Sequence, residues 1–215
     1  SLNYYIQKKY NPENEKKPQV LKGKIRIYDE NGKPKEVNSY FRQGDKVIHT
    51  KNDYQMQWYF EKEHLGYSAD YEKIGITNGE CGIIQNIFIT EEMGRKKVEM
   101  YVNYDGNFAC YRDDFSNLEH AFAITIHKSQ GSQWPVTVMP IFSAGDLFMS
   151  NNMLYTGFTR AEKISVVVGD PDFIKKVINT NSSGERNTSL SEQIKFAFNE
   201  RRLAGRAVEE GSYNE

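Results

Sequence analysis

Two polar segments, each lying next to an apolar run, constrain the fold of this chain more than any other feature. Residues 121–135 read AFAITIHKSQGSQWP, and residues 136–140 follow as an apolar run with the length of a buried strand. Residues 154–161, LYTGFTRA, precede a second apolar run over residues 164–169. From Phe115 onward, helical and extended patterns alternate in this way, which predicts parallel strands in an α/β layer. Proteins of this class place ligand-binding groups beside the ends of such strands.

The middle of the chain has a different pattern, and residues 41–112 predict a small antiparallel barrel. Turn residues such as Asp105-Gly106 separate short apolar or alternating runs, and the expected strands lie at 45–50, 80–90, 97–104 and 107–111. The expected core is built from Val47, Ile83, Ile84, Val98 and Phe108. Residues 55–75 show no firm period, so we expect a loop there with one helical turn at most.

The two ends of the chain are expected to be partly helical. Residues 2–10 predict a short helix that ends before Pro12, and a hairpin is expected around the Asn31-Gly32 turn. Asp170-Pro171 predicts the start of a helix that runs to about Val177, because proline suits a first helical turn. Beyond it we expect a polar linker over 179–187, an amphipathic helix over 189–204 and a disordered tail over 209–215.

The two polar segments, in this order, resemble motifs V and VI of superfamily 1 DNA helicases of the RecD-like branch, which have a UvrD-like C-terminal domain. Close relatives in that branch include the α subunit of exodeoxyribonuclease V. Residues 41–47 (FRQGDKV), 52–54 (NDY) and 77–84 (TNGECGII) resemble the SH3-like barrel inserted into the second motor domain of these helicases. Leu2-Asn3, Ile6-Gln7 and Asn11-Pro12 resemble the helix before that insertion, and the match over residues 13–40 is weak.

The resemblance implies an α/β fold class with an inserted small all-β domain, that is, a partial P-loop-type (RecA-like) motor domain plus an SH3-like barrel. The implied domains are a lead-in helix and hairpin at 1–40, the barrel at 41–112, half of the second motor domain at 113–180, and a linker, terminal helix and tail at 181–215.

The resemblance also implies roles for particular residues. Arg160, expected on a helix that begins near Asn151, matches an arginine that reaches the γ-phosphate of ATP as an arginine finger, while a solvated helix arginine is the alternative. Gly131 and Gln133 match the nucleotide-facing end of the first motif, where many relatives carry Glu in place of Gln133. The implied contacts with DNA backbone phosphates come from Thr125, His127, Lys128 and Ser129, and the alternative for this segment is a solvated helix start.

The chain contains no G-x-x-x-x-G-K-[ST] phosphate loop and no acidic run after an apolar strand in a suitable place. We therefore expect the C-terminal part of a longer helicase that hydrolyses ATP with Mg²⁺ held by a preceding motor domain, and no ATP or metal site in this chain alone. The expected partners are single-stranded DNA, that preceding domain and, as a further class, other subunits of a helicase–nuclease complex. In this family translocation runs 5′ to 3′, and the process is DNA recombination and repair.

Composition excludes some classes of function. The formal net charge is −1 over 215 residues, so any contact with DNA must be local. Cys81 and Cys110 lack metal-ligand spacing; they could pair in principle, but we expect a reduced, cytoplasmic protein. No apolar run approaches the length of a membrane span. Asp113-Asp114 and Asp170 with Asp172 are expected at helix starts rather than in a metal site.

Several alternatives stay open from the sequence. Gly44-Asp45 and Asn78-Gly79 are expected to serve turns, since glycine permits positive φ. Tyr54, Trp58 and Tyr59 either pack in the barrel core or stack on DNA bases. Three interpretations of the whole chain stay open. It is part of a longer, active helicase, a complete non-catalytic SH3-like binding module, or a degenerate helicase relative that serves as a scaffold.

Overall fold

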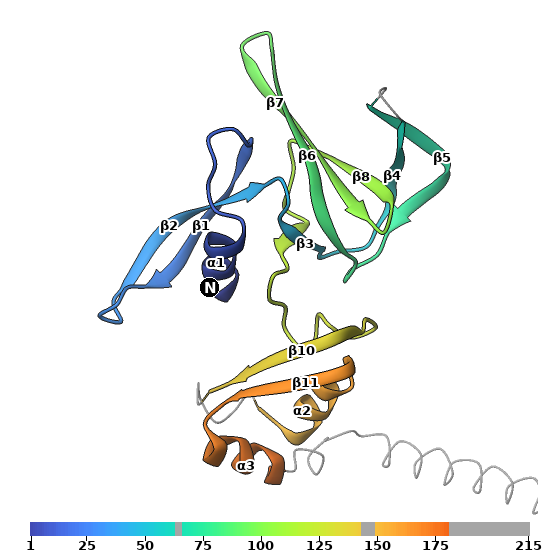
Figure 1. Cartoon of the computed structure of the whole chain (residues 1–215). Coiled ribbons are helices and arrows are strands. Elements are labelled where there is room, and N and C mark those ends of the chain that lie inside the picture. The colour runs from blue at the N-terminus through green and yellow to red at the C-terminus, as the bar shows by residue number, and fades with distance from the viewer. Residues whose placement is uncertain (63–65, 143–148, 181–215) are drawn as a thin grey trace, which may run out of the picture. The chain divides into compact units, whose positions relative to one another are not determined.

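A computed structural model describes residues 1–62, 66–142 and 149–180 (Figure 1). The chain divides into two compact units: residues 1–135 with 159–163, and residues 136–158 with 164–215. The predicted linker at 179–187 lies mostly, and the predicted helix at 189–204 and tail at 209–215 lie entirely, outside the described residues.

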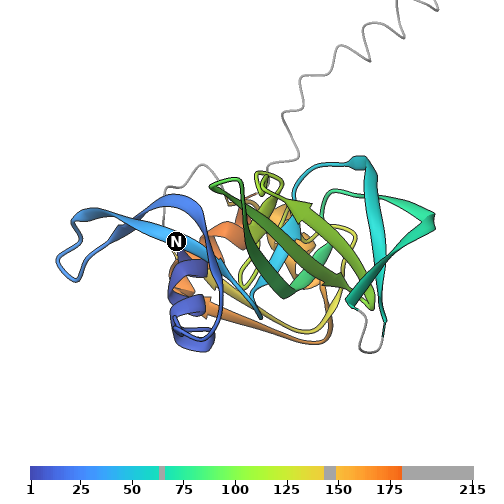
Figure 2. The ribbon, with the colours of Figure 1, turned by 90° about the horizontal axis from the view of Figure 1, so that it is seen from above.

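The first unit begins with helix α1 (Leu2–Tyr10), which confirms the predicted N-terminal helix. Strands β1 (Gln19–Tyr28) and β2 (Pro34–Arg42) then form the predicted antiparallel hairpin. At its turn, Gly32 has a φ of 74°, and the Asp29 carboxylate accepts the amides of Asn31 and Lys33. The hairpin extends away from the larger sheet of this unit in both views (Figures 1 and 2).

A seven-stranded sheet forms the rest of the first unit, with the strand order β5-β4-β8-β7-β6-β3-β9. Its strands are β3 (Lys46–His49), β4 (Asp53–Lys62), β5 (Gly66–Ile76), β6 (Cys81–Glu92), β7 (Arg95–Tyr104), β8 (Asn107–Arg112) and β9 (Leu118–His120). All of its recorded neighbour pairs are antiparallel. The strands predicted at 45–50, 80–90, 97–104 and 107–111 are therefore confirmed as β3, β6, β7 and β8.

The loop predicted at residues 55–75 is wrong, because β4 and β5 occupy most of it. Two register shifts, between Asp53 and Gln57 and between Gln57 and Trp58, interrupt the alternation of β4. A bulge moves every later side chain to the opposite face, so the sequence has no continuous period of two there. Trp58 is 2% exposed and lies in the core, whereas Tyr54 is 71% exposed.

The sheet is open among the described residues, since its edge strands β5 and β9 do not pair with each other. The closed barrel over residues 41–112 therefore stays a prediction. Of its predicted core, Val47 and Ile84 lie in the main cluster, Val98 packs against that cluster, and Phe108 lies in a second cluster. Ile83 was predicted wrongly as a core residue: it is 46% exposed because it follows buried Gly82 on an alternating strand.

The second unit contains most of β10 (Trp134–Ile141) and β11 (Ala161–Gly169), with α2 (Asn151–Phe158) between them in sequence and α3 (Pro171–Asn179) after them. The Thr137 hydroxyl donates to Ser165 at 3.1 Å, and Gly169 lies against the Ile141 backbone. From the first contact to the second, the residue number increases along both strands. The two strands therefore run parallel, as predicted. Met139, Leu154 and Phe173 form part of the core of this unit.

Two predictions about helix ends have opposite outcomes. The Asp170 carboxylate accepts the amide of Asp172 at 2.9 Å and caps α3, which confirms the helix start predicted there. Asp113-Asp114 does not begin a helix: Asp113 has a φ of 56° and accepts the Val98 amide at 2.8 Å, and Asp114 accepts the Ser116 amide at 2.9 Å. Short polar side chains satisfy loop amides as readily as helix amides, and sequence alone does not separate the two cases.

Across residues 1–62, 66–142 and 149–180, we find neither a helix long and apolar enough to cross a membrane nor a group of three potential metal-ligating side chains.

Candidate nucleotide and nucleic-acid interface

The first motif lies on a run of tight turns between β9 and β10. The Ser129 amide donates to the Thr125 carbonyl at 3.1 Å, and the Ser132 amide donates to the Ser129 carbonyl at 3.2 Å. Gly131 has a φ of 88°, a conformation that residues with a Cβ adopt at a cost. A Cβ placed on Gly131 would meet no atom within 4 Å, so the glycine serves the turn and leaves open space beside it.

Thr125 and His127 are both exposed. The Thr125 hydroxyl accepts the Lys128 amide at 3.3 Å, which is the capping role that the sequence left open. That hydroxyl can still donate its own proton, so capping and phosphate contact are compatible.

Lys128 and Ser129 already have partners inside the fold. The Lys128 ammonium lies 2.6 Å from a Glu119 carboxylate oxygen, and this contact lowers the pKa of Glu119. Ser129 is 6% exposed, and its hydroxyl donates to the Ile126 carbonyl at 2.6 Å. Ser129 thus stabilises the turn, whereas Lys128 is only half-buried and its ammonium has further donors.

Arg160 lies in a turn between α2 and β11, and its predicted place on the helix is wrong. The helix ends at Phe158, and only Thr159 separates its end from Arg160. The chain turns at these residues because it must enter β11. The guanidinium donates to the Ser132 carbonyl at 3.2 Å and to the Thr159 hydroxyl at 3.1 Å. The Trp134 amide in turn donates to the Arg160 carbonyl at 2.9 Å. These bonds bring Arg160 next to the segment that contains Gly131 and Gln133.

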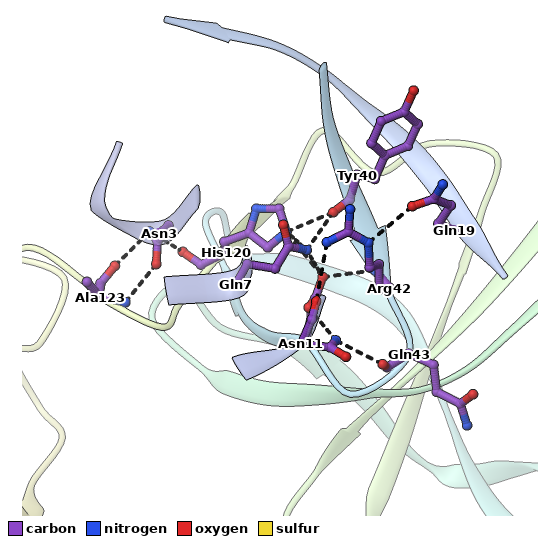
Figure 3. Close-up of polar contacts among 10 residues, drawn as sticks. Asn3, Gln7, Asn11, Gln19, Tyr40, Arg42, Gln43, His120 and Ala123 are labelled. Atoms are coloured by element: carbon purple, nitrogen blue, oxygen red, sulfur yellow. Dashed lines mark hydrogen bonds and ion pairs between the residues drawn. The ribbon is translucent and has the colours of Figure 1, made fainter. Parts of the chain in front are cut away.

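A buried polar centre that the sequence did not reveal lies beside the first motif (Figure 3). Asp45 is 0% exposed, and its carboxylate accepts from Gln7 Nε2 at 2.6 Å, Asn11 Nδ2 at 2.7 Å and the Arg42 amide at 2.8 Å. His120 Nε2 lies 3.3 Å from the same carboxylate. The signal that could have found this centre is the spacing of Asn3, Gln7 and Asn11, which recur every four residues on one face of α1.

Gly44-Asp45 also serves a turn, as the sequence predicted. Gly44 has a φ of 90°, and the Asp45 amide donates to the Arg42 carbonyl at 3.0 Å. Gly79 has a φ of 98°, and its amide donates to the His49 carbonyl at 2.8 Å, so the turn predicted at Asn78-Gly79 is confirmed.

A second buried histidine, His49, lies within the large sheet. Its Nδ1 is 2.8 Å from the Tyr111 hydroxyl, which is 2.8 Å from the Tyr104 hydroxyl. Burial lowers the pKa of His49 and raises the pKa of both tyrosines, so this chain of side chains is neutral near pH 7. None of these three residues belongs to the segments that carry Arg160 or Thr125.

Comparison with known proteins gives three kinds of match. Residues 120–168 match the family model of the UvrD-like helicase C-terminal domain. The chain is 32% identical over 172 residues to an uncharacterized protein, MJ1519, of Methanocaldococcus jannaschii, covering 75% of this chain and 14% of that protein. It is 26% identical over 195 residues to the ATP-dependent RecD2 DNA helicase of Deinococcus radiodurans, covering 90% of this chain and 21% of the helicase. A Pif1 helicase from Bacteroides, solved with ADP-AlF3 and single-stranded DNA, aligns with a TM-score of 0.40 and 18% identity over 93% of this chain and 42% of that one.

The chain thus spans about a fifth or less of the length of these curated relatives. Every residue that the sequence analysis assigned to nucleotide or DNA contact, from Thr125 to Arg160, falls inside the family match at 120–168. Residues 120–168 are therefore similar to the C-terminal domain of UvrD-like helicases, and the longer sequence is similar to RecD-like helicases.

Proposed function

We propose that this chain supplies the trailing half of the ATP cleft and part of the single-stranded DNA path of an ATP-dependent DNA helicase. The observation that carries this proposal is the hydrogen bond from Arg160 to the Ser132 carbonyl, 3.2 Å long. It fixes the cationic residue of the second motif beside Gly131 and Gln133 of the first, although 27 positions separate Gln133 from Arg160 in sequence (160 − 133 = 27).

The side chains beside this contact fit a nucleotide phosphate. A guanidinium offers several donors in one plane, which suits a group with several anionic oxygens. The open space beside Gly131 leaves room for a ligand, and the exposed Gln133 amide can hydrogen-bond a ribose hydroxyl. MgATP supplies the transferable phosphoryl group, and Arg160 contributes positive charge where negative charge develops. Within this proposal, the preceding motor domain of the helicase supplies the ligands of Mg²⁺.

We assign the DNA path to the exposed Thr125 and His127, with Lys128 beside them. Hydroxyl, imidazole and ammonium donors hold backbone phosphates without reading bases, as translocation along any sequence requires. Neutralising one phosphate in this way makes binding salt-dependent.

The sheet formed by β10 and β11 has an exposed apolar face, and we expect another part of the protein to pack against it. Val136, Val138, Ile164, Val166 and Val168 are 52%, 62%, 55%, 40% and 47% exposed. A two-stranded parallel sheet is normally covered on both faces, so this face suits the rest of a motor domain. Within this proposal the helicase moves 5′ to 3′, acts in recombination and repair, and works alone or with nuclease subunits.

The isolated chain is expected to bind ATP weakly and not to hydrolyse it. Arg160 together with Gly131 and Gln133 is not expected to offset the hydration of a triphosphate and its lost translational freedom. Isothermal titration calorimetry of the chain with MgATP checks this, with a phosphate-release assay run in parallel. Sub-micromolar affinity would show that the chain holds a complete nucleotide site, which would refute the division of the cleft proposed above.

A further inference from the structure

We propose that α1 is an anchor for the candidate DNA-binding segment, and that Asn3 is the positioning residue that joins them. This inference rests on the proposed function, because it concerns how residues 125–128 are presented to single-stranded DNA. Asn3 does not touch DNA in this scheme, and it acts through the backbone of residues 120–123.

The Asn3 side chain makes three hydrogen bonds with that backbone (Figure 3). Its Nδ2 donates to the His120 carbonyl at 3.0 Å and to the Ala123 carbonyl at 2.8 Å, and its Oδ1 accepts the Ala123 amide at 2.7 Å. An amide side chain has two donor hydrogens and one oxygen, so Asn3 directs both donors and its acceptor to one short stretch of chain.

That stretch has little other support from regular structure. Strand β9 ends at His120, and the last bond of this ladder runs from the Ala121 amide to the Lys46 carbonyl at 2.8 Å. The turns of the first motif begin at Thr125. Asn3 therefore bridges the interval between the end of the sheet and the start of the candidate site.

The helix itself is fixed by the buried centre around Asp45. Gln7 and Asn11 donate to the two carboxylate oxygens at 2.6 and 2.7 Å, and each also donates to a backbone carbonyl, of Tyr40 at 2.8 Å and of Gln43 at 3.0 Å. Both amide hydrogens of Gln7 are used in this way, so the Nε2 of His120, which faces Asp45 and the Tyr40 carbonyl, carries the proton. The helix that carries Asn3 is thus hydrogen-bonded to a buried polar centre.

The test measures binding of a fluorescent oligothymidine to the full chain by anisotropy, over a series of salt concentrations. Asn3→Ala is expected to weaken binding about tenfold, because roughly one residue of backbone must then be ordered on binding. The slope of log K against log salt should stay unchanged, since the phosphate contacts are still formed. Lys128→Ala should instead lower that slope by about 0.7, the value for one phosphate contact on a single strand.

Tyr5→Phe is the matched control on the same helix. It removes one hydrogen bond of α1, from the Tyr5 hydroxyl to the Tyr28 carbonyl at 2.9 Å, which joins the helix to the β1–β2 hairpin. It should leave DNA affinity within about twofold of the parent chain, while its melting temperature reports the loss of stability. An Asn3→Ala chain that binds DNA as Tyr5→Phe does overturns the anchor.

Hydrogen exchange separates failure of the anchor from failure of the proposed function. The Ala123 amide should be protected in the parent chain and in Tyr5→Phe, and it should lose about tenfold or more of that protection in Asn3→Ala. If the parent chain binds no DNA, the proposed function fails and the exchange result alone decides on the anchor. Unchanged protection of Ala123 in Asn3→Ala overturns the anchor whatever the DNA result.

Discussion

Under the proposed function, replacing Arg160 with Ala in the full-length protein should reduce ATP turnover by about 10³–10⁵, the contribution that arginine fingers make to phosphoryl transfer. The physical reason is the loss of a fixed positive charge beside Gly131 and Gln133, where Arg160 is held by its bond to the Ser132 carbonyl at 3.2 Å. Single-stranded DNA binding should stay nearly intact, because the proposal assigns the phosphate contacts to Thr125 and His127. Steady-state ATPase assays with saturating DNA measure the first effect, and anisotropy measures the second.

Two further variants sharpen this test. Arg160→Lys keeps the charge but lacks the planar fork, so it should restore little turnover. Thr125→Ala should weaken DNA binding while the basal ATPase without DNA survives, and unwinding should fall in both cases for different reasons. Near-normal turnover in Arg160→Ala would make Arg160 a structural residue that only ties β11 to the Ser132 turn.

Replacing Asp45 with Ala should cost the folded chain about 3–5 kcal/mol, because several buried or part-buried donors lose their acceptor at about 1–3 kcal/mol each. Asp45 is 0% exposed, and its removal leaves donors from Gln7, Asn11 and the Arg42 amide facing a cavity. Buried donors without partners carry most of that cost. Urea unfolding monitored by tryptophan fluorescence gives the change in the free energy of unfolding.

Asp29→Ala is the matched control, because Asp29 also accepts two backbone amides, those of Asn31 and Lys33, at 2.9 and 2.8 Å. Asp29 is exposed, so water replaces the carboxylate and the expected loss is about 1 kcal/mol or less. Equal losses in the two variants would show that the Asp45 centre is no more than an ordinary turn.

The sequence predicted the elements whose periodicity is local and uninterrupted. Helix α1, the hairpin around Gly32 and the parallel pairing of β10 with β11 follow from apolar spacing and turn chemistry alone. The family resemblance located the two motifs, and the family match at 120–168 supports that placement. The individual roles of Thr125, His127 and Arg160 remain predictions.

The wrong or missed predictions have physical causes that cannot be inferred from the order of residues along the chain. The bulges near Gln57 shift the register of β4, so a real strand resembles a loop in sequence. Arg160 was placed on the helix that begins near Asn151, yet that helix ends at Phe158 and the chain turns before β11. Asp45 was seen only as a turn residue, since its partners Gln7 and His120 lie 38 and 75 positions away.

The bonds of Asn3 also set an order of events during synthesis. Asn3 lies 120 positions before Ala123, so α1 leaves the ribosome on the order of ten seconds before its partner at about 5–20 residues per second. A helix of nine residues is marginal by itself in water, and the buried carboxylate that accepts from Gln7 and Asn11 is absent until Asp45 is translated. Helix α1 is therefore synthesised well before the backbone that Asn3 binds, and its contacts with residues 120–123 can form only after those residues have been translated.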